Sequence, residues 1–167
     1  MIGYCCINMT IDRCVNKTMR KATFFEKGLN YVGELALSNL DNMLHILHWN
    51  VDNDILLYRM SSDMFPWMSE YEFEDLPNYK QISHKCQAIG NYAKSNNIRL
   101  SFHPGPFNVL GSNNLNVVEK TINELTKHAE IMDLIGLDQS HYYPINIHVS
   151  ATKPSKKVIA KQFCEGF

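Results

Sequence analysis

Several common sequence features are absent from this chain of 167 residues. It has no apolar run of the roughly 18 residues needed to cross a bilayer, and its N-terminus lacks the basic and then long apolar segments of a secretory signal. The formal net charge is only −1, which gives no overall attraction to nucleic acid. The sequence therefore predicts a soluble intracellular protein, cytoplasmic or nuclear, with no membrane partner.

The cysteines predict no disulfide framework. The five cysteines are an odd number and form no C-x-x-C pair, which predicts free thiols in a reducing compartment. Adjacent Cys5 and Cys6 lie in an apolar stretch, where we expect small, buried and inert side chains. The G-x-S-x-G, phosphate-loop and dinucleotide-fold motifs are also absent, so the sequence gives little support to the chemistries that use them.

What the sequence does contain is a strand followed by a helix, repeated four times. The predicted strands are residues 2–7, 55–60, 98–103 and 145–149, each short and rich in β-branched or large apolar residues. Apolar spacing predicts helices over residues 37–47, 82–93 and 122–132, and a weaker one after Pro154. Asn116 and Glu119 form a candidate capping box for the third helix, and Gly136 is its candidate stop.

This alternation predicts an α/β fold with parallel strands covered by helices. Four units suit either a small open sheet or half of a (β/α) barrel of the TIM type. A complete barrel of that type has eight units and needs about 250 residues. Residues 98–103 and 145–150 alternate apolar and polar side chains, whereas a strand buried on both faces is almost wholly apolar. We therefore favour residues 1–167 as one domain, the N-terminal half of an eight-unit barrel with a polar interior.

Two histidines stand at equivalent positions on successive strands. His103 and His148 each fall near the end of a predicted strand, on its polar side, so their imidazoles are expected to converge on one space. Imidazole is a common ligand for zinc, manganese and iron, and carboxylates would complete such a site. For the five remaining histidines, a surface or packing role is the simpler interpretation: His45, His48, His84, His128 and His141.

Charged residues gather in three places. Basic residues follow the first strand and recur near the end of the chain, and an acidic run lies between them. A solvated charged surface is the simplest interpretation of each. Their members are Arg13, Lys17, Arg20, Lys21 and Lys27; Lys153, Lys156, Lys157 and Lys161; and Glu70, Glu72, Glu74 and Asp75.

Five blocks of the chain resemble the UV damage endonuclease family, in the family's order and spacing. They are MIGYCCIN, NLDNMLHILHWN, ILLYRMSSDMFPWM, IRLSFHPGPFNVLGS and INIHVS. The third and fourth blocks are the most specific. The resemblance implies a (β/α) barrel with a divalent metal cluster, usually manganese, that nicks double-stranded DNA on the 5′ side of a UV photoproduct. It makes the chain a metal-dependent DNA-repair hydrolase that uses no nucleotide cofactor.

The resemblance also implies roles for individual residues. It makes His103 and His148 metal ligands, with no catalytic residue beyond the ligands. The DNA and lesion contacts it implies are Tyr4, Asn8, Arg59, Pro106, Phe107 and Lys153. Phe107 keeps the family's aromatic wedge, whereas Pro106 departs from the Gln or His common at that position.

The family's remaining ligands would lie beyond Phe167, so we expect this chain to be incomplete and inactive alone, and to self-associate through open sheet edges. Two alternatives remain open. One is a metal-dependent sugar isomerase or epimerase of the same barrel type, which also pairs strand-end histidines with a metal. The other is a non-catalytic half-barrel fragment that acts only in assembly.

Overall fold

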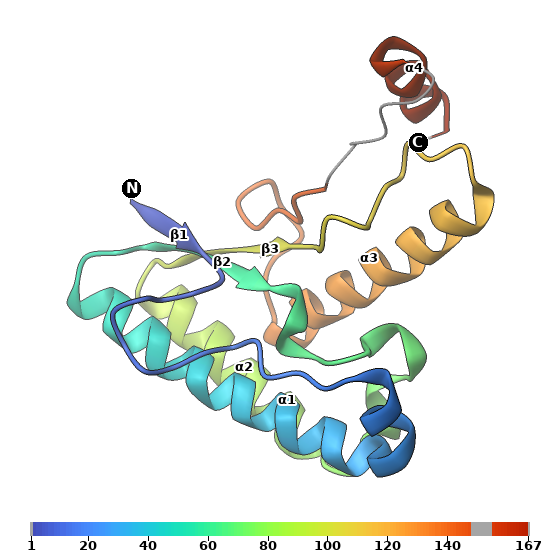
Figure 1. Cartoon of the computed structure of the whole chain (residues 1–167). Helices are drawn as coiled ribbons and strands as arrows, with labels where there is room; N and C mark the ends of the chain where they lie inside the picture. The colour runs from blue at the N-terminus through green and yellow to red at the C-terminus, as the bar shows by residue number, and fades with distance from the viewer. Residues whose placement is uncertain (1, 148–154, 167) are drawn as a thin grey trace.

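The computed structural model describes residues 2–147 and 155–166 (Figure 1). Its strands are β1 (Gly3–Cys5), β2 (Leu57–Ser61) and β3 (Arg99–His103). The α-helices are α1 (Lys21–Asp52), α2 (Tyr79–Ser95), α3 (Leu115–Ile135) and α4 (Lys156–Gly166). Three short 3-10 helices follow β2: η1 (Ser62–Met64), η2 (Met68–Glu70) and η3 (Phe73–Asp75). Within the described residues, no helix is long and apolar enough to span a membrane.

The three strands form one parallel sheet in the order β1-β2-β3, which confirms the predicted α/β class. Beside β3, Ile145 makes an isolated parallel bridge to Phe102, and the Phe102 backbone bonds to Pro144 and Asn146 at 3.1 and 3.2 Å. This bridge lies at the start of the predicted fourth strand. Residues 148 and 149 of that strand fall outside the described residues.

Helices cover one face of the sheet (Figure 1). Side chains from β2 and β3 that point to this face are fully buried: Tyr58, Met60, Leu100 and Phe102. They belong to the same core as the apolar stripes of α1 and α2, which include Met43, Ile46, Leu47, Ile82 and Ile89. Burial of each such side chain stabilises the fold by about 1.5–3 kcal/mol relative to exposure.

Two glycines permit close approaches within this arrangement. A Cβ on Gly90 in α2 would lie 1.8 Å from the backbone oxygen of Ile135 in α3, and one on Gly3 would lie 2.3 Å from that of Leu57. Only glycine lets these backbones approach so closely. The strand β1 and the packing of α2 on α3 both depend on these positions.

The helices extend beyond the segments that apolar spacing predicts. α1 begins at Lys21, and Gly28 interrupts its helical backbone with φ 61°. Gly136 ends α3 in the left-handed conformation, as predicted, with φ 77°. The predicted capping box at Asn116 is wrong, because Asn114 precedes the helix and its side chain accepts a hydrogen bond from the Asn116 amide.

Candidate functional site

The face of the sheet opposite the helices carries polar side chains in register. Cys5 pairs with Arg59 and Arg59 with Ser101, while Ser61 pairs with His103 two residues further along. Strand side chains alternate between the two faces, so these residues form rows on one surface. The predicted polar face, with Arg59 and His103 on it, is therefore present in the described sheet.

His103 lies at the carboxyl end of β3. It is beside Cys5, the last residue of β1, and Cys6, which follows that strand. The Cys6 Sγ is 3.9 Å from the His103 Nδ1 and 3.2 Å from the Cys5 Sγ. Cys5 is exposed and Cys6 is half-buried. The prediction of two buried cysteines is wrong, because Cys5 lies on the edge strand β1, on the sheet face opposite the helices, and Cys6 follows it.

Cys6 departs from strand geometry. Its φ is 58°, in the left-handed region that side chains other than glycine rarely adopt. The Cys6 amide donates to the Arg59 carbonyl at 2.8 Å, and its carbonyl accepts from the Tyr58 hydroxyl at 2.8 Å. These two bonds hold the conformation, which brings the Cys6 thiol toward the same side as that of Cys5.

Burial and the neighbouring Cys5 thiol raise the pKa of Cys6 to about 12, although the positive charge of Arg59 lowers it. A thiol with such a pKa is protonated near neutral pH, so Cys6 by itself is a poor nucleophile. Burial likewise raises the pKa of the Tyr58 hydroxyl far above its ordinary value, so it stays a hydrogen-bond donor to Cys6.

A groove of about 800 Å³ lies where β2 and β3 end. One wall is the segment after β2, including Trp67, and the other is the N-terminal half of α3, including Lys120. Gly105, Phe107 and Asn108, which follow β3, also line it. The loops at the carboxyl ends of parallel strands are the usual place for a binding site in α/β folds, and this groove has that position.

Phe107 is the most exposed large apolar side chain in this region, at 90%. Pro106 beside it is also exposed. An aromatic side chain with this exposure contributes little to the core, so packing does not account for its position. The placement is compatible with the predicted aromatic wedge, and the wedge role stays a prediction.

Tyr4 and Asn8 occupy a different place. The Tyr4 ring packs edge-on against Tyr58 at 5.3 Å, and its hydroxyl donates to the Asn50 Oδ1 of α1 at 2.7 Å. The Asn8 amide donates to the Tyr4 hydroxyl at 2.9 Å, and its carbonyl oxygen accepts from the Thr10 amide at 2.8 Å. Both side chains therefore anchor β1 to α1, and their predicted DNA contacts remain untested.

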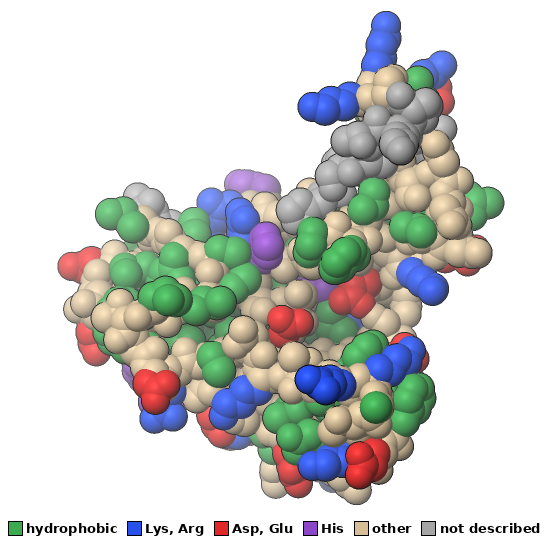
Figure 2. Space-filling view, viewed as in Figure 1, with side chains coloured by type: hydrophobic (Ala, Val, Ile, Leu, Met, Phe, Trp, Pro, Cys, Tyr) green, Lys and Arg blue, Asp and Glu red, His purple; other side chains and the backbone are tan. Residues whose placement is uncertain are grey.

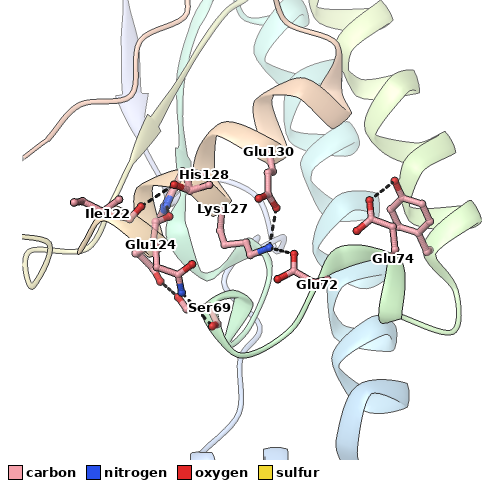
Figure 3. A network of polar contacts seen from close by, with 11 residues as sticks. Ser69, Glu72, Glu74, Ile122, Glu124, Lys127, His128 and Glu130 are labelled. Atoms are coloured by element: carbon pink, nitrogen blue, oxygen red, sulfur yellow. Dashed lines mark hydrogen bonds and ion pairs between the residues drawn. The ribbon is translucent and has the colours of Figure 1, made fainter. Parts of the chain in front are cut away.

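A polar network holds the two walls of the groove together (Figure 3). Ser69 in η2 donates to the Glu124 carboxylate of α3, and Asn123 donates to the Ser69 carbonyl at 3.3 Å. Lys127, whose side chain is only 4% exposed, contacts the carboxylate of Glu72 and that of Glu130, the latter at 2.9 Å. The network fixes the segment after β2 against α3.

Within that network, burial lowers the pKa of Lys127, but its bonds to Glu72 and Glu130 raise it by more in sum, so the pKa is raised and the ammonium stays charged. His128 lies beside it with its ring edge-on to Phe102 at 4.6 Å. Its Nδ1 donates to the Glu124 carbonyl at 2.7 Å, and burial lowers its pKa. His128 is a packing histidine.

The predicted basic surfaces are exposed where the structure describes them. Arg13, Lys17, Arg20, Lys21 and Lys27 all lie at the surface, and Lys21 pairs with Glu70 beside the groove at 3.2 Å. Lys156, Lys157 and Lys161 are exposed on α4, and Figure 2 shows basic side chains gathered there. His148 and Lys153 lie outside the described residues, so their predicted roles stay predictions.

Sequence reasoning missed the grouping of Cys5, Cys6 and His103. It also missed Trp67 and Lys120 as groove residues. No spacing signal links Cys6 to His103, because they are 97 residues apart and meet only through the order of the strands. The adjacent cysteines were the one visible clue.

Comparison with known proteins found relatives that are named as UV damage endonucleases. A sequence model of the family described as UV-endonuclease UvdE matches residues 1–167. The UV DNA damage endonuclease of Clostridium perfringens is 30% identical over 167 residues, which are 99% of this chain and 39% of that protein. The putative UV-damage endonuclease of Acanthamoeba polyphaga mimivirus is 30% identical over 176 residues, which are 99% of this chain and 52% of that protein.

A solved structure agrees with this relationship. The crystal structure of SacUVDE superposes with a TM-score of 0.85 at 32% identity, and covers 98% of this chain and 54% of its own. The chain therefore spans about half, or less, of the length of the proteins it matches. With a family match over every residue, the chain belongs to the UV-endonuclease UvdE family.

Proposed function

We propose that this chain is part of a DNA-repair endonuclease that hydrolyses the phosphodiester bond on the 5′ side of a UV photoproduct. The observation that carries the proposal is the 90% exposed Phe107, on a groove at the carboxyl ends of the strands. His103 ends the polar face of the same sheet. The named activities of the relatives, UV DNA damage endonucleases, support the same substrate.

Lesion recognition would use the deformability of damaged DNA. A photoproduct stacks poorly, so inserting an aromatic wedge and extruding bases costs less there than in intact duplex. Phe107 has the exposure that insertion requires, and Lys120 offers a positive charge on the same groove. Arg59 lies deeper, on the polar face, where a phosphate would meet its guanidinium after the duplex is bent.

We also propose that β1, β2 and β3 are the first strands of a (β/α) barrel of the TIM type, whose polar interior is the Cys5–Arg59–Ser101 face. The parallel order and the bridge from Phe102 to Ile145 support a fourth strand beside β3. An incomplete barrel leaves strand edges unpaired, and β1 is such an edge, so we propose that the chain self-associates there.

The proposed function includes a divalent metal centre. Manganese prefers carboxylate and carbonyl oxygens together with imidazole. In the described part of the chain, the donors grouped with His103 are two thiols, and no carboxylate belongs to the group. These residues do not fit a manganese cluster by themselves, so a hard-metal centre needs His148 and further ligands, and we propose that the chain alone does not nick DNA.

Binding and nicking assays on the same preparation test the function. We expect the chain to bind a UV-irradiated duplex more tightly than the identical unirradiated duplex, measured by fluorescence anisotropy over a range of salt concentrations. Phe107→Ala should reduce the preference for damage, whereas Lys120→Ala should weaken binding to both duplexes and flatten the salt dependence. Equal affinity of the unmodified chain for the two duplexes would overturn the proposed specificity.

Nicking is measured as the conversion of irradiated supercoiled plasmid to open circles in the presence of manganese. We expect no conversion by the chain alone, and lesion-dependent conversion when the chain is extended to the length of its relatives. Loss of conversion in the extended protein carrying His103→Ala would support the ligand role of His103. Efficient nicking by the chain alone would overturn the inactive-fragment proposal and leave the family activity intact.

A further inference from the structure

Three thiol and imidazole groups converge at the carboxyl ends of β1 and β3. The Cys5 Sγ, the Cys6 Sγ and a ring nitrogen of His103 all lie within 4.8 Å of one another. In residues 2–147 and 155–166, this is the one group of three or more His, Cys, Asp or Glu side chains that meets this limit. Two sulfurs and an imidazole are a soft donor set.

The backbone is arranged to produce this convergence. Successive strand residues normally direct their side chains to opposite faces, which would separate the two thiols. The φ of 58° at Cys6 cancels that alternation and leaves the sulfurs 3.2 Å apart. A left-handed conformation at a residue other than glycine costs about 1–3 kcal/mol and tends to occur at ligand-binding sites. The Cys6 backbone, held by the Arg59 carbonyl and the Tyr58 hydroxyl, therefore fixes the two sulfurs side by side.

The distances between the two sulfurs and the imidazole nitrogen suit a d¹⁰ cation with tetrahedral coordination. With bonds of about 2.3 Å to sulfur and about 2.0–2.1 Å to nitrogen, tetrahedral angles place two sulfurs roughly 3.8 Å apart, and sulfur and nitrogen roughly 3.6 Å apart. The observed distances are 3.2 Å between the sulfurs and 3.9 Å from the Cys6 Sγ to the His103 Nδ1. The two measured distances thus differ from the tetrahedral values by about 0.6 Å or less, and the Cys5 Sγ lies within 4.8 Å of the His103 ring nitrogen, so side-chain rotations can complete the site.

Charge also favours this class of ion. Binding releases the two thiol protons to solvent, and two thiolates with a neutral imidazole balance a divalent cation. Cys5 is exposed, which leaves the fourth coordination position accessible to water. Hard cations such as Mg²⁺ gain little from sulfur ligands.

We propose that Cys5, Cys6 and His103 bind one thiophilic divalent cation, with Zn²⁺ as the physiological representative of the class. This site differs from the proposed hard-metal centre in its cysteine ligands and shares only His103 with it. If the proposed nuclease function holds, zinc here would take His103 from that centre and inhibit nicking. Zinc binding itself is independent of that function and is measured without DNA.

Cobalt substitution provides the direct test. Co²⁺ added to the reduced chain, in a buffer free of thiols, should give the intense near-ultraviolet band of sulfur-to-cobalt charge transfer, and one equivalent of Zn²⁺ should abolish it. Cys5→Ser, Cys6→Ser and His103→Ala should each weaken zinc affinity more than about 100-fold, because loss of even an outer-shell partner costs about 10–100-fold. Cys164→Ser, which removes an exposed thiol on α4, should bind like the unmodified chain.

Alkylation of the unmodified chain checks the site without relying on any variant. Zinc should protect the exposed Cys5 from maleimide, mapped by mass spectrometry, while the exposed Cys164 reacts at an unchanged rate. Absence of the charge-transfer band overturns the proposal. Equal zinc affinity of Cys164→Ser and Cys5→Ser would also overturn it, and so would alkylation of Cys5 at the same rate with and without zinc.

Discussion

The two faces of the sheet are built for different purposes. On the helix side, Tyr58, Met60, Leu100 and Phe102 are wholly buried and every one packs into the core. On the other side, Cys5, Arg59, Ser101 and His103 are polar and become more exposed toward the β1 edge. Neighbouring residues of one strand lie on opposite faces. A substitution on the helix face should therefore change stability, whereas a substitution at the next residue should change the chemistry of the polar face.

The largest expected effect comes from the helix face. Phe102→Ala removes a fully buried ring and should lower the free energy of unfolding by about 3–5 kcal/mol. Ser101→Ala, one residue away on the polar face, should cost about 1 kcal/mol or less. Urea denaturation, with the slope of the transition held constant, measures both. Similar losses for the two variants would contradict the division between the faces.

The groove wall should be the next most sensitive region. Lys127→Ala removes a buried ammonium that contacts Glu72 and Glu130, and we expect a loss of about 2–3 kcal/mol. The matched control is Lys94→Ala, whose ion pair with Asp138 is solvent-exposed and worth about 1 kcal/mol or less. If both changes cost the same, the wall is held by apolar packing and not by the network.

Mild acid should weaken the helix face through His128. Burial lowers its pKa in the folded state, whereas in the unfolded chain the pKa is about 6.5. The unfolded chain therefore takes up a proton first, so stability is full above about pH 6.5 and falls with pH until the folded pKa is passed. His128→Gln should flatten the pH dependence of the thermal midpoint, and His84→Gln, an exposed control, should leave it unchanged.

The smallest effect on stability should come from Phe107. Its ring is 90% exposed, so Phe107→Ala should change the free energy of unfolding by less than about 0.5 kcal/mol. The same variant should lose about 1–3 kcal/mol of its preference for UV-damaged duplex, the value of one stacked base. A large drop in stability would mean that Phe107 is a loop anchor, and the wedge proposal would then lose its basis.

The sequence determined much of this protein because the relevant signals are local. Alternation within residues 98–103 was enough to place Phe102 in the core and His103 on the polar face, since the strand period is two. Gly136 was readable as a helix stop because its left-handed backbone is a property of one residue. The specific blocks at residues 55–68 and 98–112 were likewise sufficient to indicate the family.

Other features required the tertiary structure, because they depend on which strands become neighbours. Nothing local brings Cys6 to within 3.9 Å of His103; the parallel order β1-β2-β3 does so. The left-handed backbone of Cys6 has no sequence signal, since it is imposed by bonds to Arg59 and Tyr58 on the next strand. Residue patterns fixed the faces of each element, and only the assembled sheet decided which side chains meet across it.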